Sequence, residues 1–274
     1  MDEDVNAIAY LGLPENHHIA YHRVRPTADG DGYNDRQGDR CPGLVFLGGF
    51  NSAMTGNKAV FLQNWAISRG LGLVRFDYRG HGESSGDFEA FGISDWLADS
   101  LAVLDRLTDG PQILIGSSMG GWLSLLLARH RPERIAGMVT IAAAPDFTAT
   151  SLRNRLTEAQ RSALRRDGRL ALPSQYSDAP YVITQHLLDD GQNHLVMQSP
   201  LTCPCPVHLL HGTADTDVDM QTSVRLLRHL DSPDARLTLV RGADHRFSNH
   251  DQLQILGDAV LGVMDRSRPA QRPG

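Results

Sequence analysis

The 274-residue chain has few cysteines, no excess of positive charge and no long apolar run. Its three cysteines, Cys41, Cys203 and Cys205, form an odd and sparse set that argues against a secreted disulfide framework. The formal net charge of −6 argues against recognition of nucleic acid or of an anionic membrane through a basic face. We therefore expect no nucleic-acid partner.

Membrane and targeting features are also missing from the sequence. No apolar run approaches the ~18 residues needed to span a bilayer. Residues 1–4 are acidic apart from the initial methionine and lack the basic and apolar regions of a signal peptide. Hydrophobic residues (41%) and charged residues (21%) occur in ordinary globular proportions, so a packed core needs no disulfide or metal. These features predict a cytoplasmic globular protein without a membrane span.

Short apolar runs alternate along the chain with longer segments of helical periodicity. In one such segment Ile93, Leu97, Leu101 and Leu104 follow at spacings that place them on one helix face. Strands that alternate with helices indicate βαβ units and a mostly parallel sheet flanked by helices, here after an antiparallel start. The eight expected strands lie at residues 6–11, 18–25, 44–47, 72–76, 113–115, 135–142, 207–210 and 236–240.

One segment, residues 147–206, interrupts this alternation. It has no strand pattern, and the helical spacing of its leucines predicts helices. We expect a single domain over residues 1–274, with a core of 1–146 and 207–274 and a helical cap insertion at 147–206 over the carboxyl edge of the sheet. Four aromatic and aliphatic cap residues are candidates to line an acyl pocket, namely Tyr176, Tyr181, Leu187 and Leu188. The alternative is that they only pack the cap against the core.

The same segment carries six arginines between Arg153 and Arg169. They could attract acidic substrates, or they could belong to solvated helix faces. The sequence leaves both interpretations open.

The strongest local signal is the segment Gly116-Ser117-Ser118-Met119-Gly120, which follows an apolar strand and precedes a helix. This G-x-S-x-G pattern between a strand and a helix is typical of a nucleophile elbow. Its glycines permit a strained turn in which the residues two before and two after the serine approach each other closely. We predict that Ser118 is the nucleophile; a Gly/Ser-rich turn without chemistry is the alternative.

Two partners follow Ser118 in the chain order of a Ser–Asp–His triad. Asp215 and His245 each come shortly after a predicted strand, so all three residues should converge at one edge of the sheet. Serine needs an adjacent base, and histidine can take and return a proton when a carboxylate fixes its tautomer. We therefore predict the triad Ser118, Asp215 and His245.

Neighbouring residues compete for these roles. Asp217 and Asp219 lie close to Asp215, but Asp215 follows the strand more directly and is preferred. His250 lies five residues past His245 at the start of a helix, so we expect it on the surface. We expect the remaining histidines to face solvent as well.

An acyl-transfer site also needs two backbone N–H donors for an oxyanion. One is expected from Met119, directly after the nucleophile. The other is expected from the loop Gly48-Gly49-Phe50-Asn51, where we favour Phe50, with Gly49 beside the substrate. The alternative is that the two glycines only form a tight turn.

Patterns for cofactors and metals are incomplete. Residues 80–86 miss the spacing of a dinucleotide-binding loop by one residue. The segment Cys203-Pro204-Cys205-Pro206 offers too few ligands for zinc. We expect neither a cofactor nor a metal.

Several segments resemble the α/β-hydrolase family of serine hydrolases. They are the loop at residues 76–84, the elbow, and the segments around Asp215 and His245. Within that family, residues 109–114, 116–123, 172–177, 209–212 and 244–246 are similar to a mitochondrial branch of acyl-protein thioesterases and acyl-glucuronide esterases. The resemblance implies an α/β-hydrolase fold, the triad named above, and acylated cysteine thioesters or activated acyl esters as substrates. Because the chain begins without a mitochondrial presequence, a bacterial cytoplasmic relative is favoured.

We therefore predict a serine hydrolase that cleaves carboxylic esters or thioesters through an acyl-enzyme. Its partner would be a small-molecule or acylated substrate. The alternatives are a non-catalytic ligand binder with the same fold, and an acyltransferase or lactonase that uses the same triad.

Overall fold

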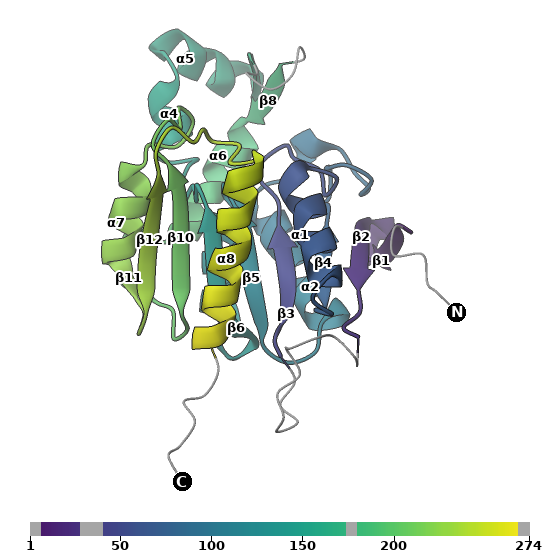
Figure 1. Cartoon of the computed structure of the whole chain (residues 1–274). Helices are drawn as coiled ribbons and strands as arrows, with labels where there is room; N and C mark the ends of the chain where they lie inside the picture. Colours follow the sequence, from purple (N-terminus) through teal and green to yellow (C-terminus); the bar gives the residue numbers. More distant parts are fainter. Residues whose placement is uncertain (1–6, 28–40, 174–179, 268–274) are drawn as a thin grey trace.

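The computed structural model describes residues 7–27, 41–173 and 180–267, and its central element is an eight-stranded sheet (Figure 1). The strand order is β1-β2-β4-β3-β5-β6-β10-β12, in which β2 pairs antiparallel with β1 and β4 and the other pairs are parallel. The strands are β1 (Ala9–Gly12), β2 (His18–Val24), β3 (Gly43–Leu47), β4 (Leu73–Phe76), β5 (Gln112–Ser117), β6 (Ile135–Ile141), β10 (Val207–Gly212) and β12 (Ala235–Val240). The predicted mostly parallel, eight-stranded sheet is confirmed.

Helices cover both faces of this sheet. The α-helices of the described residues are α1 (Asn57–Ile67), α2 (Ile93–Leu107), α3 (Met119–His130), α4 (Ser151–Arg155), α5 (Glu158–Asp167), α6 (Gln185–Gly191), α7 (Gln221–His229) and α8 (His250–Arg266), of which α4, α5 and α6 belong to the connection between β6 and β10. Residues of α1 and α8 pack on one face, and residues of α2, α3 and α7 pack on the other (Figure 1). Successive side chains of β5 pack on opposite faces of the sheet. Leu114 packs with residues of α2 and α3, whereas Ile113 and Ile115 pack with residues of α1 and α8.

The connection between β6 and β10 differs from the prediction. It contains α4, α5 and α6, as expected for helices, but also short strands that the sequence did not indicate. These are β7 (Arg169–Leu172), β8 (Tyr181–Thr184) and β9 (Leu201–Thr202). β7 pairs antiparallel with β8, and β9 pairs in parallel with β11 (Leu230–Asp231). Such short strands depend on partners in space, and they are too brief for an alternation of polar and apolar residues to reveal them.

The parallel strands bring the predicted triad to one edge of the sheet. Ser118 follows β5, Asp215 follows β10 and His245 follows β12. Because the carboxyl ends of these strands point the same way, the three residues converge there. The β6–β10 connection extends beyond this edge, with α4, α5 and β8 at the top of Figure 1. The three residues therefore lie between the carboxyl edge of the sheet and this connection.

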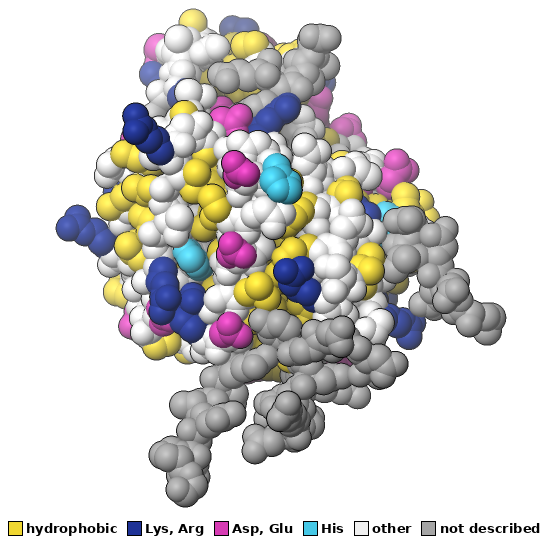
Figure 2. Space-filling model, in the orientation of Figure 1, with side chains coloured by type: hydrophobic (Ala, Val, Ile, Leu, Met, Phe, Trp, Pro, Cys, Tyr) yellow, Lys and Arg dark blue, Asp and Glu magenta, His cyan; other side chains and the backbone are white. Residues whose placement is uncertain are grey.

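The surface carries charges of both signs. Figure 2 shows acidic and basic side chains interspersed over the face that carries α8, in keeping with the net charge of −6. Large exposed hydrophobic side chains come from several elements, namely Ile8, Tyr10, Val60, Ile67 and Leu239. Within the described ranges, no helix has both the length and the apolar character that crossing a membrane requires.

Candidate active site

Ser118 occupies a sharp turn between β5 and α3. Its φ of 53° and ψ of −114° lie outside the regions that a residue with a side chain ordinarily adopts. A Cβ on Gly116 would clash with the backbone of Gly120, and a Cβ on Gly120 would clash with the carbonyl groups of Leu47 and Gly48. Only glycine fits at both positions, so the sequence folds into the strained turn that the G-x-S-x-G pattern predicted.

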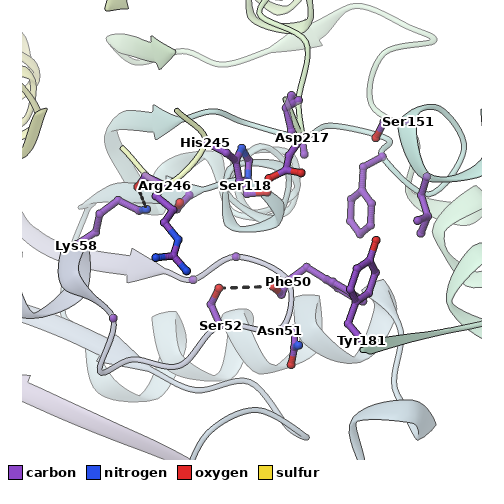
Figure 3. Close-up of a pocket in the computed structure, with 18 of the residues that line it drawn as sticks. Phe50, Asn51, Ser52, Lys58, Ser118, Ser151, Tyr181, Asp217, His245 and Arg246 are labelled. Carbon is purple, nitrogen blue, oxygen red and sulfur yellow. Dashed lines mark hydrogen bonds between the residues drawn. The ribbon is translucent and has the colours of Figure 1, made fainter. Parts of the chain in front are cut away.

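Asp215 and His245 meet beside the cavity that Ser118 lines. Oδ2 of Asp215 lies 2.8 Å from Nδ1 of His245, which is a hydrogen-bond distance. Oδ1 of Asp215 accepts hydrogen bonds from the backbone amides of Asp217 and Val218, each at 2.8 Å. The Asp215 side chain is fully buried, whereas that of His245 is 17% exposed. Both His245 and Ser118 line the cavity, and Figure 3 draws them next to each other.

A second histidine, His211, supports the carboxylate of Asp215. Its Nε2 lies 3.3 Å from Oδ2 of Asp215 and 2.9 Å from the carbonyl oxygen of Val218, and its Nδ1 lies 2.7 Å from Oγ of Ser223. Burial alone would raise the pKa of Asp215. Hydrogen bonds from His211 and His245, the charge of His245 and the amide of Val218 outweigh burial and hold that pKa well below its usual range. Asp215 is therefore a carboxylate that can orient an imidazole.

The loop after β3 passes beside the nucleophile. A Cβ on Gly49 would lie 3.5 Å from Cβ of Ser118, in van der Waals contact. Gly49 and Phe50 both line the cavity, while Met119 is the fully buried first residue of α3. The residues predicted to supply the two oxyanion donors, Phe50 and Met119, thus belong to the two backbone segments that meet at Ser118.

Buried polar side chains fix this loop. The hydroxyl of Tyr78 donates a hydrogen bond to the carbonyl of Gly48 at 3.2 Å. The amide of Asn51, whose φ is 53°, donates to Nε2 of His81 at 3.2 Å, and Nδ1 of His81 lies 3.3 Å from the carbonyl oxygen of Arg79. Burial lowers the pKa of His81 to about 4, although the hydrogen bond to Arg79 acts in the opposite direction. The ring is therefore neutral near pH 7 and can accept the Asn51 amide.

The expectation that the remaining histidines face solvent is wrong for three of them. His22, His81 and His211 are 5%, 4% and 0% exposed. For His81 and His211, hydrogen-bond partners within the fold compensate burial of the ring, and a single sequence does not reveal such partners. His250 is exposed, as predicted.

The cavity has a volume of about 840 Å³ and two sides of different character. Its apolar side includes Phe50 from the loop after β3 and Phe147, Leu152, Leu156 and Tyr181 from the β6–β10 connection. The ring of Phe50 is centred 5.7 Å from that of Phe147 and 6.2 Å from that of Tyr181, in edge-to-face contacts. This side can bury an apolar chain.

The other side of the cavity is cationic. Lys58 and Arg246 line it next to His245, as Figure 3 shows. Nζ of Lys58 donates a hydrogen bond to the carbonyl of Arg246 at 2.5 Å. Burial lowers the pKa of Lys58 to about 8; the carboxylate of Asp244 opposes this shift and the charge of Arg246 adds to it. Neither residue was predicted from the sequence, although the position of Arg246 directly after His245 was a usable signal.

Four residues of the β6–β10 connection were predicted as candidates to line an acyl pocket, and the structure describes three of them. Tyr181 lines the cavity. Leu187 and Leu188 are 2% and 7% exposed, pack in hydrophobic clusters and are not among the lining residues, so they hold this segment on the core. The fourth, Tyr176, lies outside the described residues.

The arginines of the connection mostly have partners away from the cavity. Arg155 is the one that lines the cavity, and its guanidinium donates to the carbonyls of Thr216 and Asp217 at 2.7 Å each. Four others form ion pairs: Arg161 and Arg165 with Glu158, Arg166 with Asp167, and Arg169 with Glu89. For these four, the structure favours the solvated-face interpretation over recognition of a substrate.

One group of side chains has the composition of a metal site. Asp215, Asp217 and His245 offer ligand atoms within 4.8 Å of one another, and no other such group occurs in the part of the chain that the structure describes. However, Asp215 already accepts two amides and contacts His245. A metal would have to compete with the hydrogen bond between Asp215 and His245, so the arrangement fits a triad better than a metal centre.

The sequence is similar to those of known proteins over most of its length. Residues 44–255 match the model of the alpha/beta hydrolase family. The chain is 32% identical over 261 residues to the mitochondrial palmitoyl-protein thioesterase ABHD10 of Bos taurus, covering 95% of this chain and 81% of that protein. It is also 32% identical to the protein of the same name from Mus musculus, with 95% and 83% covered.

Solved structures are similar over almost the full length. A putative hydrolase from Agrobacterium vitis superimposes with a TM-score of 0.85 at 37% identity, covering 94% of this chain and 98% of that one. The alpha/beta hydrolase domain-containing protein 10 from mouse superimposes with a TM-score of 0.83 at 30% identity, covering 96% and 100%. The likeness therefore includes the β6–β10 connection as well as the sheet.

Proposed function

The chain belongs to the α/β-hydrolase family, and from this premise we propose that it is a serine hydrolase that cleaves carboxylic esters or thioesters. The family and the relatives named as hydrolases make it a hydrolytic enzyme. One observation carries the more specific proposal. His245 lies 2.8 Å from the buried carboxylate of Asp215 and shares a cavity with Ser118, which a strained turn presents to that cavity.

The proposed reaction proceeds through an acyl-enzyme. Oγ of Ser118 attacks the acyl carbonyl while Nε2 of His245 takes its proton, and Asp215 keeps His245 in the tautomer with its own proton on Nδ1. The amides of Phe50 and Met119 donate hydrogen bonds to the oxyanion. His245 then gives the proton to the leaving alcohol or thiol, and water releases the acid from Ser118 by the same sequence of steps.

The apolar side of the cavity is proposed to hold the acyl chain. Phe50, Phe147, Leu152, Leu156 and Tyr181 offer aromatic and aliphatic surface there. An acyl chain buried against them gains about 0.8 kcal/mol for each methylene group removed from water. The relatives are named palmitoyl-protein thioesterases, which supports thioesters of acylated cysteine as a substrate class. Activated acyl esters are proposed as a second class, because the same attack of Ser118 on an acyl carbonyl would cleave them.

The β6–β10 connection is proposed to be a cap inserted into a single domain, with a core of residues 1–146 and 207–274 and a cap of 147–206. Phe147, Leu152, Leu156 and Tyr181 of this segment face the same cavity as Ser118, which supports a role in substrate selection. We keep the prediction that the protein is bacterial and cytoplasmic. The relatives named ABHD10 are mitochondrial, whereas the similar solved structure from Agrobacterium vitis is of a bacterial protein.

Replacing Ser118 with alanine tests the proposal. We expect turnover of para-nitrophenyl esters and of acyl thioesters to fall by roughly a thousandfold or more, because the nucleophile is lost. A fluorophosphonate probe should add mass at Ser118 in the parent and none in Ser118→Ala. The melting temperature and circular dichroism of the variant show whether the fold is retained. Ser68→Ala, an exposed serine at the end of α1, is the matched control and should keep the parent activity.

Two results would contradict the proposal. Hydrolysis by Ser118→Ala at the parent rate would show that another group performs the chemistry. A parent protein that neither turns over any ester or thioester nor reacts with the probe would be a ligand binder with this fold. Product analysis in the presence of an added alcohol distinguishes hydrolysis from acyl transfer.

A further inference from the structure

The charged residues that line the cavity are unevenly distributed. Besides His245, the lining residues include three cations, Lys58, Arg155 and Arg246, and one carboxylate, Asp217. Asp217 lies 4.0 Å from Arg155, and its carbonyl accepts a hydrogen bond from the same guanidinium. The carboxylate that lines the cavity therefore lies with Arg155, while Lys58 and Arg246 add positive charge next to His245.

The proposed chemistry determines which part of a substrate meets these cations. The leaving alcohol or thiol must receive its proton from Nε2 of His245, so it lies on the His245 side of Ser118. Figure 3 shows Lys58 and Arg246 on that side and Phe50 and Tyr181 on the opposite side. The acyl chain and the leaving group would thus enter environments of opposite character, one apolar and one cationic.

We infer that Lys58 and Arg246 form a subsite for a negatively charged group, a carboxylate or a phosphate, on the leaving alcohol or thiol of the substrate. This inference rests on the proposed serine-hydrolase function. It places recognition of acidic substrates in the core of the fold, at α1 and the loop after β12. The arginines of the β6–β10 connection, for which the sequence left this role open, are not required for it.

The chemistry of Lys58 suits such a subsite. An ammonium group has three N–H donors, and the carbonyl of Arg246 accepts from Nζ at 2.5 Å, which orients the side chain along the cavity wall. Partial burial strengthens the attraction of a cation for an anion relative to bulk water. The charged groups that face Lys58 are Asp244 and Arg246, and the titratable imidazole of His245 lines the same cavity. Because the pKa of Lys58 is lowered to about 8, its charge and its contribution should fade as pH rises above that value.

A structural role for Lys58 must be separated from binding. Through its hydrogen bond to Arg246, Lys58 also supports the loop that carries His245. If support were its whole role, substitution would slow hydrolysis of neutral and anionic substrates to the same extent. The informative quantity is therefore the ratio of kcat/KM for an anionic substrate to kcat/KM for a neutral one.

Three chromogenic esters measure this ratio. They are para-nitrophenyl butyrate, its analogue with a carboxylate on the nitrophenyl ring, and the para-nitrophenyl monoester of glutarate, which carries its carboxylate on the acyl chain. We expect Lys58→Met and Arg246→Met each to lower the preference for the ring-carboxylated ester about tenfold relative to the neutral ester. The glutarate ester should lose little, because its charge lies on the acyl side. Lys58→Arg should restore the preference and maintain it above pH 8.

Matched controls keep this result separate from the proposed function. Arg169→Met removes a cation that is paired with Glu89 away from the cavity, and it should leave the ratio unchanged. Ser118→Ala should abolish turnover of all three esters whatever the subsite does. A ratio that is the same in the parent, Lys58→Met and Arg246→Met would overturn the inference, even if Ser118→Ala is inactive. Equal losses on both leaving groups would also overturn it, in favour of a purely supporting role.

Discussion

The backbone amide of Asn51 donates a hydrogen bond to Nε2 of His81 across 3.2 Å. Asn51 has a φ of 53° and directly follows Phe50, whose amide is a proposed oxyanion donor. The ring of His81 is centred 5.0 Å from that of Phe88 and 5.2 Å from that of Trp96, and Phe50 packs against the same two rings. The loop beside Ser118 is therefore fixed to a buried aromatic cluster through one neutral imidazole.

Substituting His81 with phenylalanine should slow the chemical step. The variant keeps an aromatic ring in the cluster but cannot accept the Asn51 amide, so the Phe50 amide would lose its fixed direction. We expect kcat to fall about tenfold with a smaller change in KM, because an oxyanion donor acts mainly in the transition state. Steady-state kinetics on a neutral ester measure both parameters. His130→Phe, an exposed position, is the control, and an unchanged kcat in His81→Phe would contradict this role.

The stability of the protein below neutral pH should also depend on His81. Burial lowers the pKa of His81 from 6.5 to about 4, so between these values the unfolded chain binds a proton that the folded chain does not. Stability therefore falls as pH decreases through this window, by roughly 3 kcal/mol for one such group. We expect the free energy of unfolding, measured by urea denaturation, to fall less steeply with decreasing pH in His81→Phe than in the parent.

Another buried group acts in the opposite direction over part of the same window. Burial raises the pKa of Asp99 to about 6, so the folded chain holds a proton that the unfolded chain releases, and this contribution is lost as pH rises. Asp99 is present in both the parent and His81→Phe, so the comparison of slopes removes its effect. Equal slopes in the two proteins would show that His81 titrates no differently in the folded and unfolded chain.

Replacing Asp215 with asparagine should remove most of the activity and leave the fold intact. The amide cannot stabilise a protonated His245 and would favour the wrong tautomer, so we expect kcat/KM to fall by roughly a thousandfold or more. Asp217→Asn is the matched comparison, because Asp217 is the nearest alternative carboxylate and should cost less than tenfold. If Asp217→Asn were the more damaging change, the assignment of the triad carboxylate would be wrong.

Local patterns explain why the sheet and the position of the triad could be predicted from the sequence. The apolar runs of the eight strands and the glycines around Ser118 are signals within a few residues of chain. The placement of Asp215 and His245 after parallel strands was enough to bring them to one edge. Their roles in the reaction remain predictions until the variants above are measured.

The features that were not predicted depend on contacts that only the folded chain creates, some of them between distant segments. Lys58 lies in the cavity wall because its ammonium reaches the carbonyl of Arg246, which is 188 residues away in the sequence. His211 is buried because Asp215, Val218 and Ser223 surround it with partners. A single sequence lists the residue types but does not show which of them become neighbours.

The two close glycine contacts at the elbow predict a strong intolerance to a single methyl group. In Gly120→Ala the new Cβ would overlap the carbonyl groups of Leu47 and Gly48, so the backbone must shift next to Ser118. We expect a loss of about 1–3 kcal/mol in the free energy of unfolding, and a large loss of kcat. Gly12→Ala is the control, because its Cβ would meet no atom within 4 Å. A fully active, equally stable Gly120→Ala protein would contradict the close approach.

Asp146 should hold the β6–β10 connection on the core. Its two carboxylate oxygens accept hydrogen bonds from the amides of Val196 at 2.8 Å and Met197 at 3.0 Å, and Asp146 directly precedes the cavity residue Phe147. Burial raises the pKa of Asp146, while the two amides and the positive charges of Arg129 and His229 oppose this shift. The carboxylate thus connects the two ends of a segment that lines the cavity.

Substituting Asp146 with asparagine removes one of these two acceptors. Asparagine tolerates the φ of 57° at this position, so the backbone need not change, but its NH₂ group would face one of the two amides. We expect a loss of about 1–3 kcal/mol in stability, together with faster hydrogen exchange at Val196 and Met197. Asp189→Asn, an exposed aspartate in α6, is the control. Exchange at Val196 and Met197 that stays as slow in Asp146→Asn as in the parent would show that these amides are protected by packing of the segment and not by the carboxylate.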